Sequence, residues 1–211
     1  MMQDQEKIIW NGAVLKAELI ASRSFDILSD CKVLELGSLA GFFTKQILHK
    51  TNNITVIDVD NQSLQYIREN YPAIESVESD MHEFVKIPQY YDAVVIYGVL
   101  YHSPSPLSIL EDIANNIKPK YMLLESLWQG YDDRLVGVAD EPINQTGGRW
   151  TNKKHCGVVL NISQILLEQV MNNLGYKMIN KFSTADIPGY TDIITNFKPG
   201  STWCYSNWQI A

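Results

Sequence analysis

Short apolar runs alternate with amphipathic stretches along most of this chain. The clearest run, residues 92–97, is almost wholly apolar, as a strand covered on both faces must be. In the stretches between such runs, apolar residues recur at helical spacing, as Leu64 and Ile67 do. The alternation predicts an α/β protein whose strands form a largely parallel sheet.

The same pattern predicts the extent of each element. Strands are expected over residues 32–36, 53–59, 74–77, 92–97, 121–125, 176–182 and 202–210. Helices are expected over residues 12–28, 42–49, 61–71, 107–117 and 163–174. Asp60 or Asn61 is expected to cap the third of these helices and Ser163 the last, because short polar side chains satisfy the free amides of a helix N-terminus.

Neither an internal repeat nor a Pro/Gly/Ser-rich linker divides the 211 residues, so we expect a single domain over residues 1–211. Residues 1–29 form its N-terminal helical region. Residues 126–160 show little periodicity and include two of the five tryptophans. A loop of this length inside a compact domain is usually functional, so residues 126–160 are expected to form a lid or a substrate wall.

The charge of the chain changes the list of expected partners. With 17 Lys+Arg against 24 Asp+Glu, the net charge is −7 and the pI is near 5.0, which gives no broad attraction to phosphate backbones. The densest basic stretch, Lys153–Lys154 near Arg149, is explained by a solvated loop. Nucleic acid is therefore an unfavoured partner, and RNA docking would need a small local basic patch that an acidic pI does not rule out.

Targeting and metal signals are weak in this sequence. Its acidic start lacks a secretory signal, and no apolar run approaches the ~20 residues that a membrane span needs, so we expect a cytoplasmic protein that does not enter a membrane. Cys31, Cys156 and Cys204 are widely spaced, which predicts neither a disulfide framework nor a cysteine-built zinc site. No histidine pair stands at metal-ligand spacing with a carboxylate, so no metal is expected.

Glycines and acids gather where the first strands are expected to end. The first strand runs into Glu35-x-Gly37-x-x-x-Gly41, where glycines let the backbone approach a ligand and a helix N-terminus supplies amide donors. Asp58 follows Gly37 by 21 positions, the spacing at which an acid accepts hydrogen bonds from a ribose diol. Asp80 follows the third strand. Ligands of open parallel sheets bind at these carboxyl ends, so one ligand bridging them is predicted.

The turn after the first strand also restricts the kind of ligand. Leu39 stands where the dinucleotide fingerprint Gly-x-Gly-x-x-Gly needs its second glycine close to a pyrophosphate. A cofactor without a pyrophosphate is therefore favoured over NAD.

Four segments together resemble the motifs of class I S-adenosylmethionine (SAM)-dependent methyltransferases. They are residues 33–41 (VLELGSLAG), 56–58 (VID), 78–81 (ESDM) and 91–102 (YDAVVIYGVLYH), and the resemblance covers about residues 30–125. It implies a Rossmann-like, doubly wound α/β fold: a seven-stranded, mostly parallel sheet with the last strand antiparallel, in three α/β/α layers.

The resemblance also implies SAM as the cofactor and a role for each strand end. The glycine turn faces the methionine part, the acid after the second strand holds the ribose hydroxyls, and the acid after the third strand meets the adenine amino group. The implied cofactor-binding residues are Glu35, Gly37, Ser38, Gly41, Asp58, Val59, Asp80, Met81, Tyr97 and Gly98.

A narrower resemblance is to the branch that contains the tRNA wobble-uridine carboxymethyl transferase. It rests on residues 98–102, the Ser-Pro that follows, and the late Ser-capped helix. That branch follows the histidine with basic residues, whereas this chain has Ser-Pro-Ser-Pro at residues 103–106. Ordinary SAM and a small-molecule acceptor, methylated at oxygen or nitrogen, are therefore favoured. The alternatives are a tRNA-modifying methyltransferase and a non-catalytic SAM-binding module.

Two residues are candidates for catalysis. His102 follows the fourth strand, beside the expected methyl group, and imidazole titrates near neutral pH; the same residue is equally explained as a packing residue. Glu125 ends the fifth strand and is a second candidate, which would bind an acceptor amine or hydroxyl; a helix cap or a loop-anchoring carboxylate explains it equally. The candidate acceptor-binding residues are Tyr101, Trp128, Trp150 and His155, of which the last is also explained as a solvated loop residue.

Overall fold

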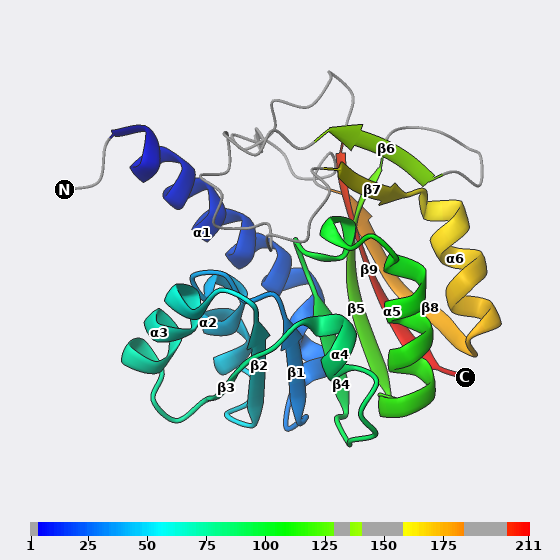
Figure 1. Ribbon diagram of the computed structural model, residues 1–211, viewed down its shortest axis with the longest axis horizontal. Coiled ribbons are helices and arrows are strands. Elements are labelled where there is room, and N and C mark those ends of the chain that lie inside the picture. Colours follow the sequence, from blue (N-terminus) through cyan, green and yellow to red (C-terminus); the bar gives the residue numbers. More distant parts are fainter. Residues whose placement is uncertain (1–3, 129–135, 141–157, 184–201) are drawn as a thin grey trace.

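A computed structural model describes residues 4–128, 136–140, 158–183 and 202–211. Its main feature is a seven-stranded sheet of order β3-β2-β1-β4-β5-β9-β8 (Figure 1). Neighbours among β3, β2, β1, β4 and β5 are parallel, and β9 is antiparallel to both β5 and β8. The expected doubly wound sheet with its last strand antiparallel is therefore confirmed.

The strands lie close to their expected positions. They are β1 (Val33–Leu36), β2 (Ile54–Asp58), β3 (Glu75–Glu78), β4 (Ala93–Ile96), β5 (Tyr121–Trp128), β8 (Tyr176–Ser183) and β9 (Thr202–Ile210). All four residues of β1 and of β4 are buried, as strands covered on both faces require.

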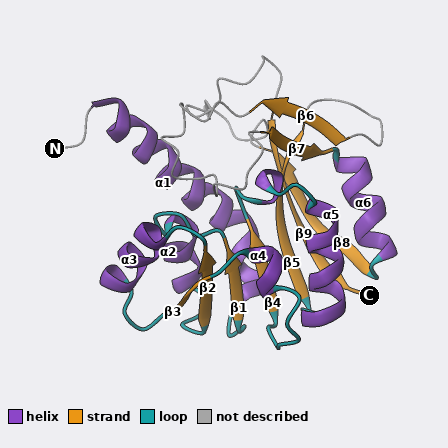
Figure 2. Cartoon of the chain, viewed as in Figure 1, coloured by secondary structure: helices purple, strands orange, loops and turns teal. Residues whose placement is uncertain are grey.

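Helices cover both faces of this sheet, giving three layers (Figure 2). One face packs against α1 (Asp4–Ser24), the 3-10 helix η1 (Phe25–Leu28), α2 (Phe42–Leu48) and α3 (Asn61–Asn70). The other packs against α4 (Met81–Phe84), α5 (Pro106–Asp112), the π-helix η3 (Ile113–Ile117) and α6 (Gln164–Asn173). None of the helices in the described ranges is both long and apolar enough to cross a membrane.

The predicted caps agree with the observed helix starts. The side chain of Asp60 accepts hydrogen bonds from the amides of Gln62 and Ser63 at the start of α3, and Ser163 accepts one from Leu166 at the start of α6. The first helix begins earlier than its apolar spacing indicated, because α1 starts at Asp4.

Residues 126–160 were expected to lack regular structure, and this was wrong in part. The strand β5 continues to Trp128, and β6 (Val136–Asp140) pairs antiparallel with β7 (Val158–Ile162) as a separate two-stranded ribbon. Val136 and Val138 of β6 are both exposed, so these two apolar residues do not form the buried face by which a strand is recognised in a sequence. The ribbon crosses the end of the sheet at which β5 stops, and β7 contacts both β5 and the 3-10 helix η2 (Leu100–His102) (Figure 1).

Strand register places the candidate chemistry at one edge of the sheet. Leu36 of β1 lies beside Ile57 of β2, and Asp58 lies beside Glu78 of β3. On the other side, Ile96 of β4 lies beside Leu124 of β5. The residues that follow each of these strands therefore lie along a single line, which is the condition for one ligand to contact several of them.

Candidate functional site

The turn between β1 and α2 has the backbone shape that its glycines permit. Gly37 and Gly41 have φ of 76° and 75°, in the left-handed region that glycine adopts without penalty. Leu39 also has a positive φ, of 51°, which costs a residue with a side chain about 1–2 kcal/mol. Leu39 thus adopts a backbone conformation that favours glycine, and the strain falls on the segment that faces the ligand edge.

Asp58 links this turn to the end of β2. The Leu39 amide donates to Asp58 Oδ2 at 3.0 Å, and the Asp60 amide donates to Oδ1 at 2.9 Å. Burial raises the pKa of the Asp58 carboxyl, and these two backbone donors act in the opposite direction. A carboxylate oxygen accepts more than one hydrogen bond, so Asp58 is held in a fixed orientation with acceptor capacity left for a diol.

Glu35 lies beneath the turn and does not face the ligand edge directly. Its side chain is buried in β1, and the Thr44 hydroxyl of α2 donates to Glu35 Oε2 at 2.6 Å. Burial raises the pKa of Glu35 to about 8, with Thr44 opposing the shift. In this structure the hydrogen bond from Thr44 to Glu35 links α2 to β1. The role of Glu35 in cofactor binding stays a prediction.

The raised pKa of Glu35 predicts how stability depends on pH. The folded state keeps a proton that the unfolded chain releases at about pH 4.5, so the free energy of unfolding falls as pH rises from there to about 8. The slope within that window is at most about 1.4 kcal/mol per pH unit. Glu35→Gln keeps an acceptor for Thr44 but cannot ionise, so urea unfolding from pH 4 to 9 should show this part of the slope removed.

Glu75 provides the matched control, because it is exposed and its Oε2 accepts from the Thr55 hydroxyl at 2.7 Å. Glu75→Gln should leave the slope as in the wild type. Equal slopes for Glu35→Gln and the wild type would show that Glu35 ionises normally in the folded protein.

The ends of β2 and β3 supply the other side of the predicted cofactor site. Val59, directly after Asp58, is a large apolar residue that is 40% exposed, which fits a face for a flat apolar group such as a base. Asp80 caps α4 by accepting from the His82 amide at 2.9 Å, and Met81 packs partly into the core below. Asp80 thus has a structural partner in addition to its predicted contact with adenine.

Tyr97, one of the implied cofactor-binding residues, packs in the core, and its contact with the cofactor stays a prediction. Tyr97 is 4% exposed and stacks against Phe25 at 5.9 Å between ring centroids, with Phe43 and Tyr205 packed edge-on. Burial raises the pKa of its hydroxyl. Side chains of adjacent strands and helices converge on this inward-facing position, so Tyr97 belongs to the core.

The turn after β4 lies against the turn after β1. A Cβ placed on Gly37 would be 2.7 Å from the Cβ of Val99, so the two turns touch at a point where only hydrogen fits. Gly98 has φ of 73°, and Ser38 is buried with its hydroxyl 3.5 Å from Asp58 Oδ2. The turn after β1 thus contacts both the turn after β4, through Gly37 and Val99, and Asp58, through Ser38. The cofactor-binding roles of Gly37, Ser38 and Gly98 stay predictions.

His102 ends η2 immediately beyond this contact. Its amide donates to the Val99 carbonyl at 3.0 Å, and its ring is tilted against that of Tyr101 with centroids 4.3 Å apart. Both side chains are half-buried. The two residues thus lie at the edge of the sheet beside β4, and their roles as base and acceptor wall remain predictions.

The sequence analysis did not single out a second histidine, His82. Its Nε2 is 3.0 Å from the hydroxyl oxygen of the buried Ser103, which also accepts from the Ser105 amide at 2.9 Å. This contact connects α4 to the segment after η2. His82 lies two residues after Asp80, which the sequence analysis had assigned to a motif. Its nearness to Asp80 was the only signal in the sequence that could have identified it.

Glu125 is a buried residue of β5 with partners from distant parts of the chain. Lys16 of α1 forms an ion pair with it at 2.8 Å, and the Tyr205 hydroxyl of β9 donates to it at 3.1 Å. The sequence analysis missed both partners, which are 109 and 80 positions away.

The other candidate acceptor residues cannot be placed. Trp128 ends β5, beside Thr202 of β9, and its side chain is not described. Trp150 and His155 lie outside the described residues. Within the ranges that are described, no three His, Cys, Asp or Glu side chains gather as metal ligands would.

Comparison with known proteins gives the matched segment and its relatives. A family model described as "Methyltransferase domain" matches residues 34–124. The ubiquinone biosynthesis O-methyltransferase of Yersinia enterocolitica is 30% identical over 110 residues, which are 50% of this chain and 45% of that protein. The ribosomal RNA small subunit methyltransferase A of Porphyromonas gingivalis is 34% identical over 85 residues, 38% of this chain and 33% of that protein. This chain thus spans less than half the length of either relative.

Solved structures share the whole fold. The N-terminal domain of EvdMO1, crystallised in the presence of SAH and D-fucose, has a TM-score of 0.64 at 16% identity, covering 100% of this chain and 98% of that one. Magnesium protoporphyrin IX methyltransferase from Synechocystis, with bound SAH, also has a TM-score of 0.64, at 11% identity and coverages of 100% and 89%. Neither structure nor relative bears on the wobble-uridine branch, which stays a prediction.

Proposed function

We propose that this protein, whose residues 34–124 match a methyltransferase domain model, is a class I SAM-dependent enzyme that transfers a methyl group from SAM to a small-molecule acceptor at oxygen or nitrogen. One observation carries the proposal: the strained turn after β1 and the end of β2 are joined through Asp58, which two backbone amides hold in place at the edge where ligands of this fold bind.

The residues at this edge fit SAM in charge and shape. When bound, SAM supplies a methyl group on a positively charged sulfonium. Asp58 would accept from the ribose diol, Val59 would cover the adenine, and the Gly37 turn would let the methionine part approach the backbone. Transfer of a methyl group is an in-line displacement, so the protein contributes mainly by positioning the two reactants and excluding water.

A hydroxyl acceptor must lose its proton during the reaction, and His102 is the candidate that receives it. His102→Ala should lower kcat by about 100-fold, the lower end of what general base catalysis contributes, and leave SAM affinity within a factor of two. Methyl release from labelled SAM, measured across a panel of phenols, amines, sugars and RNA transcripts, supplies the assay. His82→Ala is the control and should keep activity, since His82 contacts Ser103 instead of the β4 turn. Full activity of His102→Ala would remove His102 as the base.

RNA is a second candidate acceptor, favoured by one observation: several relatives matched by residues of this chain are named ribosomal RNA small subunit methyltransferase A. The net charge of −7 weighs against it, because RNA binding draws its affinity from neutralised phosphates. If the labelled methyl group appears on RNA and on no small molecule, RNA is the acceptor. The tRNA-modifying alternative would then remain one of the options. Tight SAM binding without methyl release to any acceptor would identify a non-catalytic SAM-binding module.

A further inference from the structure

The carboxyl end of β5 carries a buried carboxylate of which one oxygen has partners and the other has none. Lys16 Nζ and the Tyr205 hydroxyl both donate to Glu125 Oε1, at 2.8 and 3.1 Å. The Glu125 side chain is 0% exposed. Its other oxygen, Oε2, has no hydrogen-bond partner in the part of the chain that the structure describes. A buried acceptor left unpaired costs folding free energy, so an O–H or N–H donor that reached this atom would be stabilised there.

The unpaired oxygen faces the turn after β4. A Cβ built on Gly98 would lie 3.8 Å from Glu125 Oε2 and 4.0 Å from the Tyr101 hydroxyl oxygen. Both oxygens therefore approach the same side of the Gly98 backbone, which carries no side chain there. Tyr101 and His102 belong to the same short helix η2, so Glu125 Oε2 lies in the same corner as the candidate base.

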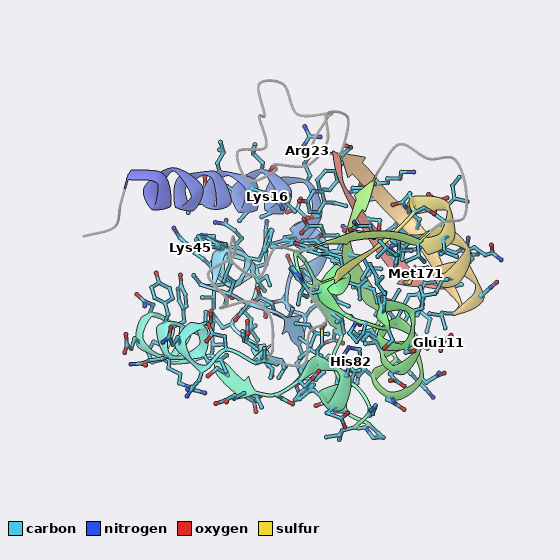
Figure 3. All side chains as sticks on the ribbon, turned by 45° about the horizontal axis from the view of Figure 1, so that its top comes forward. Lys16, Arg23, Lys45, His82, Glu111 and Met171 are labelled. Atoms are coloured by element: carbon cyan, nitrogen blue, oxygen red, sulfur yellow. The ribbon has the colours of Figure 1, made fainter. Side chains whose placement is uncertain are left out.

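Two distant elements hold Glu125 in this orientation. Lys16 projects from α1 (Figure 3) and is 13% exposed, with its ammonium group also 5.9 Å from the centre of the Tyr205 ring. Because Lys16 and Tyr205 both engage Oε1, rotating the carboxylate to satisfy Oε2 would break contacts already made. The arrangement fixes an acceptor atom in place ahead of any ligand.

A second polar side chain without partners lies in the ribbon that contacts this corner. Asn161 of β7 is 3% exposed, and neither its amide nitrogen nor its amide oxygen has a hydrogen-bond partner among the residues described. The strand β7 contacts η2 and β5. Buried amides are almost always hydrogen-bonded, so Asn161, like Glu125, has hydrogen-bonding capacity that no other described residue uses.

We infer that Glu125 Oε2 is the recognition atom for the methyl acceptor, that it takes a hydrogen bond from an O–H or N–H group of that molecule, and that Lys16 is its positioning residue. The acceptor class is then a hydroxyl or amine compound. A carboxylate would bring two hydrogen-bond acceptors together at the same buried point and is excluded. The inference rests on the proposed function only for the identity of the ligand as the methyl acceptor.

The position of Glu125 favours the methyl acceptor, and not the cofactor, as the molecule that donates a hydrogen bond to Oε2. The groups that fit the cofactor's ribose and base lie on the β2 side of β1, at Asp58 and Val59. Glu125 lies on the opposite side, beyond β4, where β5 meets β9 and α1. The competing interpretation is that Glu125 contacts the ammonium group of the cofactor's methionine part. The SAH affinity of Glu125→Gln separates these interpretations, because only a cofactor contact would lower it.

The test uses the full chain saturated with SAH and three probes of one shape: benzyl alcohol, benzylamine and benzoate. Ligand-observed NMR should detect binding of the alcohol or the amine and no binding of benzoate. Glu125→Gln should weaken that probe at least tenfold, and Lys16→Met should do so as well, while calorimetry finds SAH affinity within a factor of two of the wild type.

A matched variant shows whether the loss of probe binding is specific to Lys16 or follows from losing any ion pair between a lysine and a glutamate. Lys181→Met removes an ion pair with Glu168 at 3.1 Å between partly exposed side chains, and should change neither probe nor SAH binding. Thermal melting with SAH checks that each variant folds. If Lys16→Met does not fold, the isosteric Glu125→Gln variant decides alone.

Three results would overturn the inference: benzoate binding as well as the alcohol and amine, no binding of either donor probe to the wild type, or a loss of SAH affinity in Glu125→Gln as large as the loss of probe. Failure of the proposed function has a different signature: either SAH does not bind the wild type, or SAM binds and no methyl group is released to any acceptor.

Discussion

Replacement of Gly37 by alanine is expected to lower the free energy of unfolding by about 3 kcal/mol and to abolish measurable SAH binding. Gly37 has φ of +76°, which strains any residue with a Cβ, and that Cβ would lie 2.7 Å from the Cβ of Val99. Relief requires the turn after β1 to move away from the turn after β4. These turns carry the two sides of the predicted site, so the binding loss should exceed the loss of stability. Urea unfolding and calorimetry with SAH measure the two effects.

Gly175→Ala separates backbone strain from the clash. Gly175 has φ of +85°, but a Cβ there would meet nothing within 4 Å. This control should lose about 1–2 kcal/mol of stability and keep its SAH affinity. Unchanged SAH binding by Gly37→Ala would mean that the contact between the two turns is unrelated to the ligand.

Asp58→Ala is expected to weaken SAM binding by about 1–3 kcal/mol, which is roughly 5- to 150-fold. The substitution removes the acceptor for the ribose diol, and it also frees the Leu39 and Asp60 amides that the carboxylate now engages. Calorimetric titration of each variant and the wild type with SAM, at one temperature below all their melting transitions, gives the change in affinity.

Asp92→Ala is the control for this loss. Asp92 also accepts from a backbone amide, that of Lys32 at 2.8 Å, but it precedes β4 and so lies at the opposite edge of the sheet. SAM affinity should not change in Asp92→Ala. Equal affinities for Asp58→Ala and the wild type would refute the assignment of Asp58 to the ribose.

The sheet and one edge of the site were predictable because their signals are local. The apolar run of β4 and the glycine turn after β1 lie within short stretches of sequence, and the order of parallel strands brings their ends together. The spacing of Asp58 from Gly37 was enough to predict that it lies at the end of the second strand. The cap of α3 by Asp60 followed from residue type alone.

The partners of Glu125 could not be predicted, since tertiary packing alone brings them together. Lys16 lies on a helix that carries no motif, and Tyr205 lies on a strand that enters the sheet antiparallel from the far end of the chain. The surroundings of Tyr97 were open for a related reason: an aromatic residue at a strand end faces either the ligand or the core, and only tertiary packing brings Phe25 and Phe43 against it.

The account's central claim is that the edge formed by Gly37, Asp58 and Gly98 binds SAM. Isothermal titration calorimetry of the wild-type chain with SAM, SAH and NAD tests it most directly. The account predicts one molecule of SAM or SAH bound per chain and no heat of binding with NAD. Binding of NAD with no binding of either SAM or SAH would contradict it.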